Sequence, residues 1–321
     1  MDNSTQLRFI TANNRMNANI ICRDCGPAYA RSLRLPWSDV DSLGDLSDNS
    51  AVVVDSTLND AEVMRVRKFI DRDTALVLLK VVDPYWSRDT RGSDRSSYTR
   101  LVETRCCRPN VAILSPYEPK EWLKEVVDQL KPRLIVLPYP YLPEAEQALT
   151  PDNFAARRDR AVLTGARSGR KYPQRARIHR LRHILAKYRN SFDLLEHPGY
   201  PNLGQARRHN FVFDEFLRFI AGYKTFYICP SRADLEFLKY TECAQAGCAP
   251  VGIPATSLPA AAKSLFLDTA TFLKSMRKQP AALRNEEHFT RAVEYRAVMA
   301  NSRKAEKLRE QLVNFVVSTC N

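Results

Sequence analysis

The chain has 321 residues, 44% of them hydrophobic, and a formal net charge of +13 at pH 7. This length suffices for two domains, and no run approaches the ~20 consecutive apolar residues that span a bilayer. The first residues, MDNSTQLRF, lack the features of a signal peptide, and the eight cysteines form no repeating framework. We therefore expect a reduced, cytoplasmic protein without membrane-spanning segments.

The positive charge is concentrated in one segment of the chain. Residues 151–190 contain ten Arg and two Lys against two Asp, a net charge of +10. Such a patch attracts nucleic acid, an anionic membrane surface or phosphorylated substrates. No aromatic ladder or known nucleic-acid motif accompanies it. We therefore expect the patch to contact a phosphorylated substrate or the inner face of an anionic membrane rather than nucleic acid.

The first half of the chain alternates short apolar runs with amphipathic segments. Strands are expected at 7–10, 52–55, 75–82, 111–114 and 134–137, and helices at 59–70 and 120–130. This alternation predicts an open, mostly parallel sheet with helices on its faces. The proline-rich run LPYPYLPE at 137–144 reads as a linker, because proline cannot continue a central strand.

The alternation then restarts. Strands are expected at 161–164, 192–195, 225–229 and 249–253, with helices ending near 188, at 213–221 and at 235–246. The last thirty or so residues read as helices. The sequence thus predicts a second α/β domain.

The stretch SRADLEFLKYTECAQAGCAPV, 231–251, lies between two of these strands. Lys239 and Glu242 are three residues apart and share a helix face, while Ser231 and Arg232 lie in the preceding loop. Loops and helix N-termini at this position bind phosphates in open α/β sheets, and Glu242 would accept hydrogen bonds from ribose hydroxyls. A surface Lys–Glu pair, worth a few tenths of a kcal/mol, explains the same spacing.

A second cluster follows the strand at 161–164. Gly165 permits close backbone approach, and Arg170, Lys171 and Arg175 can meet phosphate charge. A solvated, basic helix start is the alternative explanation.

Three segments in order resemble one family. The run KYTECAQAGCAPV, containing Lys239, Tyr240 and Glu242, resembles the K-x-x-E-x-x-A-x-G-x-P-V signature of GT-B glycosyltransferases of the "glycosyl transferases group 1" type. The run from Thr164 to Arg175, with Gly165 and Tyr172-Pro173, resembles the opening of their C-terminal domain. The strand end EHPGY at 196–200, which contains His197, resembles the segment that follows.

The resemblance implies two Rossmann-like domains facing a cleft. Residues 1–142 would bind the acceptor, residues 143–293 the nucleotide sugar, and residues 294–321 would form a helix that packs back on the first domain. Transfer in this family needs no metal, because basic side chains and helix dipoles neutralise the leaving diphosphate. The resemblance favours retention of anomeric configuration.

The resemblance also suggests catalytic residues. His197 would donate to a donor phosphate or sugar hydroxyl, and Asp83 or Asp24 would serve as base in an inverting reaction. No cofactor or metal is expected beyond the nucleotide sugar, because Cys22-x-x-Cys25 has no second half of a zinc site.

Two other functions remain possible from the sequence. One is a nucleic-acid-binding protein that uses the patch at 151–190. The other is a catalytically silent GT-B-like scaffold, because Asp234 stands where many relatives carry glutamate, eight positions before Glu242.

Overall fold

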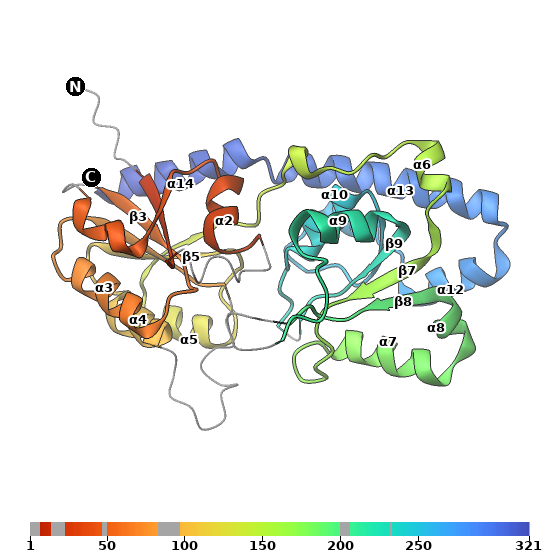
Figure 1. Ribbon diagram of the computed structural model, residues 1–321, viewed down its shortest axis with the longest axis horizontal. Helices are drawn as coiled ribbons and strands as arrows, with labels where there is room; N and C mark the ends of the chain where they lie inside the picture. The colour runs from red at the N-terminus through yellow and green to blue at the C-terminus, as the bar shows by residue number, and fades with distance from the viewer. Residues whose placement is uncertain are drawn as a thin grey trace. The chain divides into compact units, whose positions relative to one another are not determined.

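A computed structural model describes residues 7–13, 23–46, 50–82, 97–199, 206–231 and 233–320. These residues divide into two compact units: residues 1–140 with 305–321, and residues 141–304. Each unit has its own parallel sheet and its own buried core (Figure 1). The predicted fold class, α/β with two Rossmann-like domains, is therefore confirmed.

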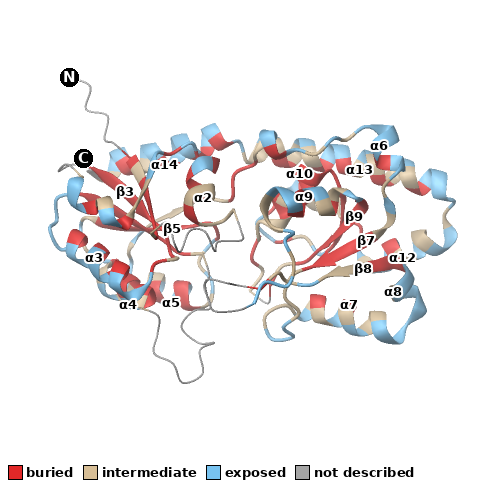
Figure 2. Ribbon diagram, in the orientation of Figure 1, coloured by how far each residue is buried: buried red, intermediate tan, exposed pale blue. Residues whose placement is uncertain are grey.

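The first unit contains a six-stranded sheet in the order β2-β1-β3-β4-β5-β6, with every pairing parallel. Its strands are β1 (Leu7–Thr11), β2 (Trp37–Asp39), β3 (Ala51–Val54), β4 (Leu76–Lys80), β5 (Val111–Ser115) and β6 (Arg133–Val136). Every residue of β3, β4 and β5 is buried, as in Figure 2, because helices cover both faces of a parallel sheet.

The helices of this unit include one at each of the two predicted ranges, 59–70 and 120–130, with bounds that agree to within one residue. They are α2 (Gly26–Ser32), the 3₁₀ helix η1 (Val40–Asp45), α3 (Asp60–Ile70), α4 (Ser97–Arg105), α5 (Glu121–Leu130) and α14 (Ala305–Cys320). A capping box fixes the start of α3: the Asn59 side chain accepts from the Glu62 amide, and the Glu62 carboxylate accepts from the Asn59 amide. The short strand β2 and the helix η1 were not predicted.

The second unit contains a four-stranded sheet in the order β10-β9-β7-β8, also parallel throughout. Its strands are β7 (Arg158–Thr164), β8 (Phe192–Leu195), β9 (Tyr223–Ile228) and β10 (Ala249–Gly252). Its helices are η2 (Pro143–Ala145), α6 (Pro151–Ala155), α7 (Pro173–Ile184), α8 (Ala186–Ser191), α9 (Phe213–Ala221), α10 (Lys239–Ala246), α11 (Ala260–Ser264), α12 (Thr269–Lys278) and α13 (Ala281–Ser302).

The boundary between the second unit and the C-terminal segment lies later than residue 294. Helix α13 runs unbroken to Ser302, and its residues Tyr295 and Met299 are fully buried in the core of the second unit. Only α14 belongs with the first unit. The division between the two units therefore coincides with the break between α13 and α14.

No helix among the described residues combines the length and apolar character needed to cross a lipid bilayer.

Candidate functional site

The strand order of the second unit creates a divergence point at the carboxyl ends of β7 and β9. The chain leaves β7 toward β8 on one side, and it leaves β9 toward β10 on the other. Loops that depart in opposite directions from neighbouring parallel strands open a crevice, where open α/β sheets bind their ligands. Gly165 follows β7 and Ser231 lies just beyond β9, so two of the predicted binding loops meet here.

Gly165 lies where two cationic side chains converge. Its φ of +89° is favoured by glycine, and a Cβ atom there would lie 3.2 Å from Arg175 Nη1 and 3.7 Å from Lys239 Nζ. Arg175 comes from the first turn of α7 and Lys239 from the first turn of α10. The fold therefore brings together two positive charges that are 64 positions apart in the sequence.

Neighbouring groups hold both cations in place. Arg175 is only 4% exposed; its Nη1 donates to the Ala166 carbonyl at 3.3 Å, and its guanidinium carbon lies 4.2 Å from the centre of the Tyr172 ring. Lys239 Nζ donates to Thr164 Oγ1 at 2.8 Å and lies 4.7 Å from the centre of the Phe216 ring. The Tyr172 ring thus packs against the Arg175 guanidinium group.

His197 lies within the field of these cations. Burial, together with the positive charges of Lys239, His209 and Arg175, lowers the pKa of His197 to about 4. Its Nδ1 accepts a hydrogen bond from the Gly199 amide at 3.0 Å, so the neutral ring carries its proton on Nε2. At neutral pH His197 is therefore an uncharged donor at the carboxyl end of β8.

The remaining basic residues of the 165–175 loop have different surroundings. Arg170 is exposed, and the Lys171 amide donates to Ser168 Oγ at 3.3 Å. Arg167 pairs with Glu196 and contacts His179. Of the predicted phosphate ligands on this loop, only Arg175 is buried beside Lys239.

The loop after β9 differs from the predicted helix start. Helix α10 begins at Lys239, and residues 235–238, where the sequence predicts the first turn of this helix, are not helical. Asp234 has a φ of +57°, and its carboxylate accepts from the Thr256 amide at 3.2 Å. Ser231 is buried, and its Oγ accepts from the Ala233 amide. Asp234 is thus bound to the turn after β10.

Tyr240 lies in the core, unlike Lys239 and Glu242 of the same KYTECAQAGCAPV run. Its side chain is fully buried, its hydroxyl donates to the Ile253 carbonyl at 2.9 Å, and its ring packs near Phe266. Tyr240 is a core residue that holds α10 against the strand after it, rather than a ligand contact. Glu242, one turn beyond Lys239, is half-buried. Arg232 and Asp83 lie outside the described residues.

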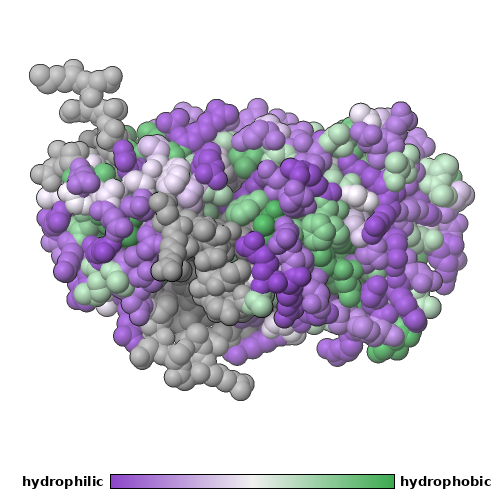
Figure 3. All heavy atoms as spheres, viewed as in Figure 1, coloured by the Kyte–Doolittle hydropathy of each residue, from purple (hydrophilic) through white to green (hydrophobic). Residues whose placement is uncertain are grey.

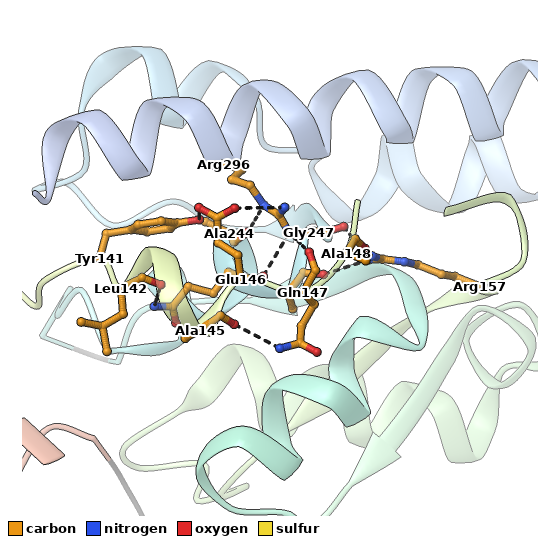
Figure 4. A network of polar contacts seen from close by, with 12 residues as sticks. Tyr141, Leu142, Ala145, Glu146, Gln147, Ala148, Arg157, Ala244, Gly247 and Arg296 are labelled. Atoms are coloured by element: carbon orange, nitrogen blue, oxygen red, sulfur yellow. Dashed lines mark hydrogen bonds and ion pairs between the residues drawn. The ribbon is translucent and has the colours of Figure 1, made fainter. Parts of the chain in front are cut away.

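The opposite end of α10 is fixed by two arginines that reach in from other elements (Figure 4). Arg296 Nε donates to the Ala244 carbonyl at 2.9 Å, and Arg157 Nη1 donates to the Gly247 carbonyl at 2.7 Å. Cations at helix C-termini satisfy otherwise unpaired carbonyls and oppose the negative end of the helix dipole. Arg157, one of the arginines of the basic patch at 151–190, therefore supports the C-terminal end of α10.

A second polar cluster lies in the first unit and includes Asp24. Lys80 ends β4 and Asp55 follows β3; both are fully buried, with Nζ and Oδ1 3.2 Å apart. Asp55 Oδ2 accepts from the Gly26 amide at 2.8 Å, and Lys80 donates to the Asp24 carbonyl. The ion pair fixes the turn that carries Asp24. Burial raises the pKa of Asp24, against the lowering effect of Lys80.

Lys80 and Asp55 were not identified from the sequence. A signal was present, because a lysine ends the apolar run LVLLK and an aspartate follows VVV. A charge at the carboxyl end of a buried parallel strand lies where such sheets place their sites.

The described residues contain no group of three or more His, Cys, Asp and Glu that could hold a metal ion. The pair Cys22-x-x-Cys25 cannot be traced fully, since Cys22 lies outside the described residues.

Comparison with protein-family profiles and with curated proteins finds no match. Among solved structures, an alpha-glucosyltransferase in complex with UDP-glucose and DNA containing an abasic site matches with a TM-score of 0.61 and 9% identity, over 97% of this chain and 99% of that one. The UDP-forming α,α-trehalose-phosphate synthase of Burkholderia xenovorans matches with a TM-score of 0.56 and 12% identity, over 92% and 79%. Anabaena HepE in complex with UDP and glucose matches with a TM-score of 0.53 and 7% identity, over 98% and 100%. The chain therefore shares the GT-B-like fold of these proteins.

Proposed function

We propose that this protein is a glycosyltransferase that takes a hexosyl or pentosyl group from a nucleotide sugar and transfers it to a hydroxyl-bearing acceptor. The observation that carries the proposal is the convergence of Arg175 and Lys239 over Gly165, at the divergence point of the second sheet. Two held cations beside a backbone without a Cβ form a site for a diphosphate. The similar folds include proteins bound to UDP or UDP-glucose.

In this proposal each residue has a separate task. Arg175 and Lys239 neutralise the charge that develops on the leaving nucleoside diphosphate, as His197 donates from Nε2 to a phosphate or sugar oxygen. Glu242 accepts hydrogen bonds from the ribose hydroxyls. These side chains would make a metal ion unnecessary.

The acceptor hydroxyl attacks the anomeric carbon as the bond to the diphosphate breaks. Where the reaction inverts configuration, Asp24 would accept the hydroxyl proton. Lys80 and Asp55 would hold the turn that carries Asp24 in position. Where configuration is retained, as the resemblance favours, an oxygen of the departing diphosphate would accept the hydroxyl proton, and no carboxylate need act as base.

The direct test is calorimetric titration with UDP, GDP, ADP, CMP and dTDP, and then with sugars of the preferred nucleotide. Lys239→Ala removes a charge-assisted contact worth roughly 1.5–3 kcal/mol, so it should weaken nucleoside-diphosphate binding about ten- to a hundredfold. Lys274→Ala, at an exposed position on α12, is the matched control and should bind as wild type. Equal affinities in both variants would contradict the proposed diphosphate site.

Turnover distinguishes a transferase from a silent scaffold. A scaffold would bind the nucleotide sugar but release no nucleoside diphosphate when acceptors are supplied. Release of the diphosphate that depends on both acceptor and Lys239 supports transfer.

A further inference from the structure

Helices α7, α8 and α12 form one layer on the second unit. They share a core in which the rings of Phe192 and Phe272 lie 5.4 Å apart, and Ile178, Tyr188 and Met276 pack around them. The outward sides of the three helices thus belong to one continuous surface, which we call the α7–α8–α12 surface.

The charged side chains that these three helices contribute to the surface are all basic. Neither 173–191 nor 269–280 contains an aspartate or glutamate. Its exposed basic residues are Arg177, Arg180, Lys187, Arg189, Lys274, Arg277 and Lys278. Within the described part of the chain, none of these side chains forms an ion pair.

The basic residues of the 151–190 segment therefore fall into two groups: some make contacts within the second unit, and the others are exposed. Arg157 binds backbone carbonyls of α10, Arg160 pairs with Asp193, and Arg182 Nε donates to the Phe192 carbonyl at 2.7 Å. Arg175 belongs to the proposed donor site. The charges left on the outside are those of the α7–α8–α12 surface.

Two large apolar side chains lie among these charges. Ile184 is 68% exposed, the highest value among the large hydrophobic residues described, and the adjacent Leu185 is 37% exposed. They stand where α7 ends and α8 begins, a connection that Figure 2 shows as exposed. In Figure 3 a small hydrophobic patch lies at the lower right of this largely hydrophilic side of the unit.

This combination fits a lipid bilayer better than a nucleic acid. Aliphatic side chains in a basic ring gain free energy by entering the boundary between headgroups and acyl chains, and the ring is attracted to anionic headgroups. A single-stranded nucleic acid instead needs flat rings for its bases to stack on. The two most exposed apolar side chains of this surface are aliphatic, so they offer no such platform.

We propose that the α7–α8–α12 surface docks on an anionic membrane, with Ile184 and Leu185 inserted at the interface. This proposal does not depend on the proposed donor site. Docking would, however, limit the distance between the donor site and the membrane. Arg175 and Ile184 lie at opposite ends of α7, nine residues or about 14 Å apart along the helix axis. A docked chain would therefore hold the backbone of Arg175 at most about that far from the membrane surface, within reach of a lipid-borne acceptor.

The test is co-sedimentation of the full chain with phosphatidylcholine vesicles, with and without phosphatidylglycerol. Binding is expected only to the anionic vesicles and should weaken with added salt. Replacing both Ile184→Asn and Leu185→Asn should lower partitioning about tenfold or more. Replacing Arg177→Ser and Arg180→Ser should lower it about fivefold per residue.

The matched control is the pair Leu283→Asn and Val293→Asn on α13, which are 56% and 41% exposed and lie outside this surface. This control should bind vesicles as wild type, and every variant should bind the preferred nucleoside diphosphate as wild type. Three results would overturn the proposal: no binding to anionic vesicles, an equal loss in the α13 control, or unchanged binding after the Ile184 and Leu185 replacements. Salt-sensitive binding of short RNA or DNA that the arginine pair abolishes and the apolar pair leaves intact would assign the surface to nucleic acid instead.

Discussion

Lys239 and Glu242 come from the same turn of α10, but their surroundings differ. Lys239 crosses to Thr164 and Gly165 on the neighbouring strand end, whereas Glu242 is half-buried on the helix itself. A carboxylate in that setting can bind ribose hydroxyls or remain a surface partner of a cation, and the two roles differ in their response to substitution.

Glu242→Gln separates these roles. As a ribose ligand, Glu242 makes charge-assisted hydrogen bonds worth roughly 1.5–3 kcal/mol, so its loss should weaken nucleotide-sugar binding about ten- to a hundredfold. If Glu242 is only half of a surface ion pair, the substitution should lower the free energy of unfolding by well under ~1 kcal/mol and leave nucleotide-sugar binding intact. Calorimetric titration measures both, with Glu286→Gln at an exposed position of α13 as control. An affinity equal to wild type would remove the ribose role.

His288 is a further residue whose setting predicts a measurable effect. It is 1% exposed on α13, both ring nitrogens lack hydrogen-bond partners among the described residues, and burial lowers its pKa to about 4. The unfolded chain protonates this ring near pH 6.5 and the folded chain only near pH 4. Stability is therefore fully retained above pH 6.5 and falls as the pH drops toward 4, by about 3 kcal/mol.

Substitution of this histidine should flatten that dependence. His288→Leu places an apolar side chain at this buried position that cannot be protonated, so the free energy of unfolding of the variant should fall less between pH 6.5 and pH 4. Urea unfolding at several pH values gives the slope. Thr290→Leu, an exposed neighbour on the same helix, is the control and should keep the wild-type slope. Parallel curves for wild type and His288→Leu would show that the ring does not govern acid stability.

At the scale of elements, the loop between β7 and α7 controls how closely Arg175 and Lys239 approach the backbone. Gly165 has a positive φ and crowded surroundings, whereas the nearest atom to a Cβ at Gly169, in the same loop, would be the Ala176 Cβ at 4.0 Å. The two glycines thus form a matched pair that differs in conformation and space.

Gly165→Ala should disturb the donor site and Gly169→Ala should not. The added methyl group strains the backbone and displaces the ends of Arg175 and Lys239, so we expect nucleoside-diphosphate binding to weaken at least tenfold, about 1.4 kcal/mol. Titration of both variants, together with their melting temperatures, checks this. Equal binding in the two variants would mean that the close approach at Gly165 has no role in binding.

At the scale of the whole molecule, the last helix belongs to the unit that begins the chain. Leu308, Leu312 and Val316 of α14 repeat every four residues and are at most 3% exposed, so they form one buried stripe. Arg34 and Glu306 add an ion pair of 2.7 Å within the same unit. The stability of the first unit should therefore depend on residues at the far end of the sequence.

Leu312→Ala tests that dependence. Loss of a fully buried leucine side chain should cost about 2–5 kcal/mol, whereas Val313→Ala, at a position 37% exposed, should cost under ~1 kcal/mol. Thermal unfolding reports the stability, and titration at low temperature reports nucleotide binding. We expect binding to remain unchanged, because every proposed donor residue lies in the 141–304 unit. Equal melting temperatures would exclude a structural role for α14.

The sequence by itself determined every strand except β2, the helices at 59–70, 120–130 and 213–221, and both parallel sheets, because burial on two faces and amphipathic periodicity are local properties. It also predicted Gly165, Lys239 and Arg175 as site residues, since residues after buried strands gather at one edge of a parallel sheet. Only the tertiary structure decided which basic side chains converge: Arg175 turns inward beside Lys239, while Arg157 supports α10 and Arg180 faces solvent. It also placed Tyr240 in the core. The reason is physical, because convergence depends on strand order and on packing between distant elements, neither of which leaves a periodic signal in the chain.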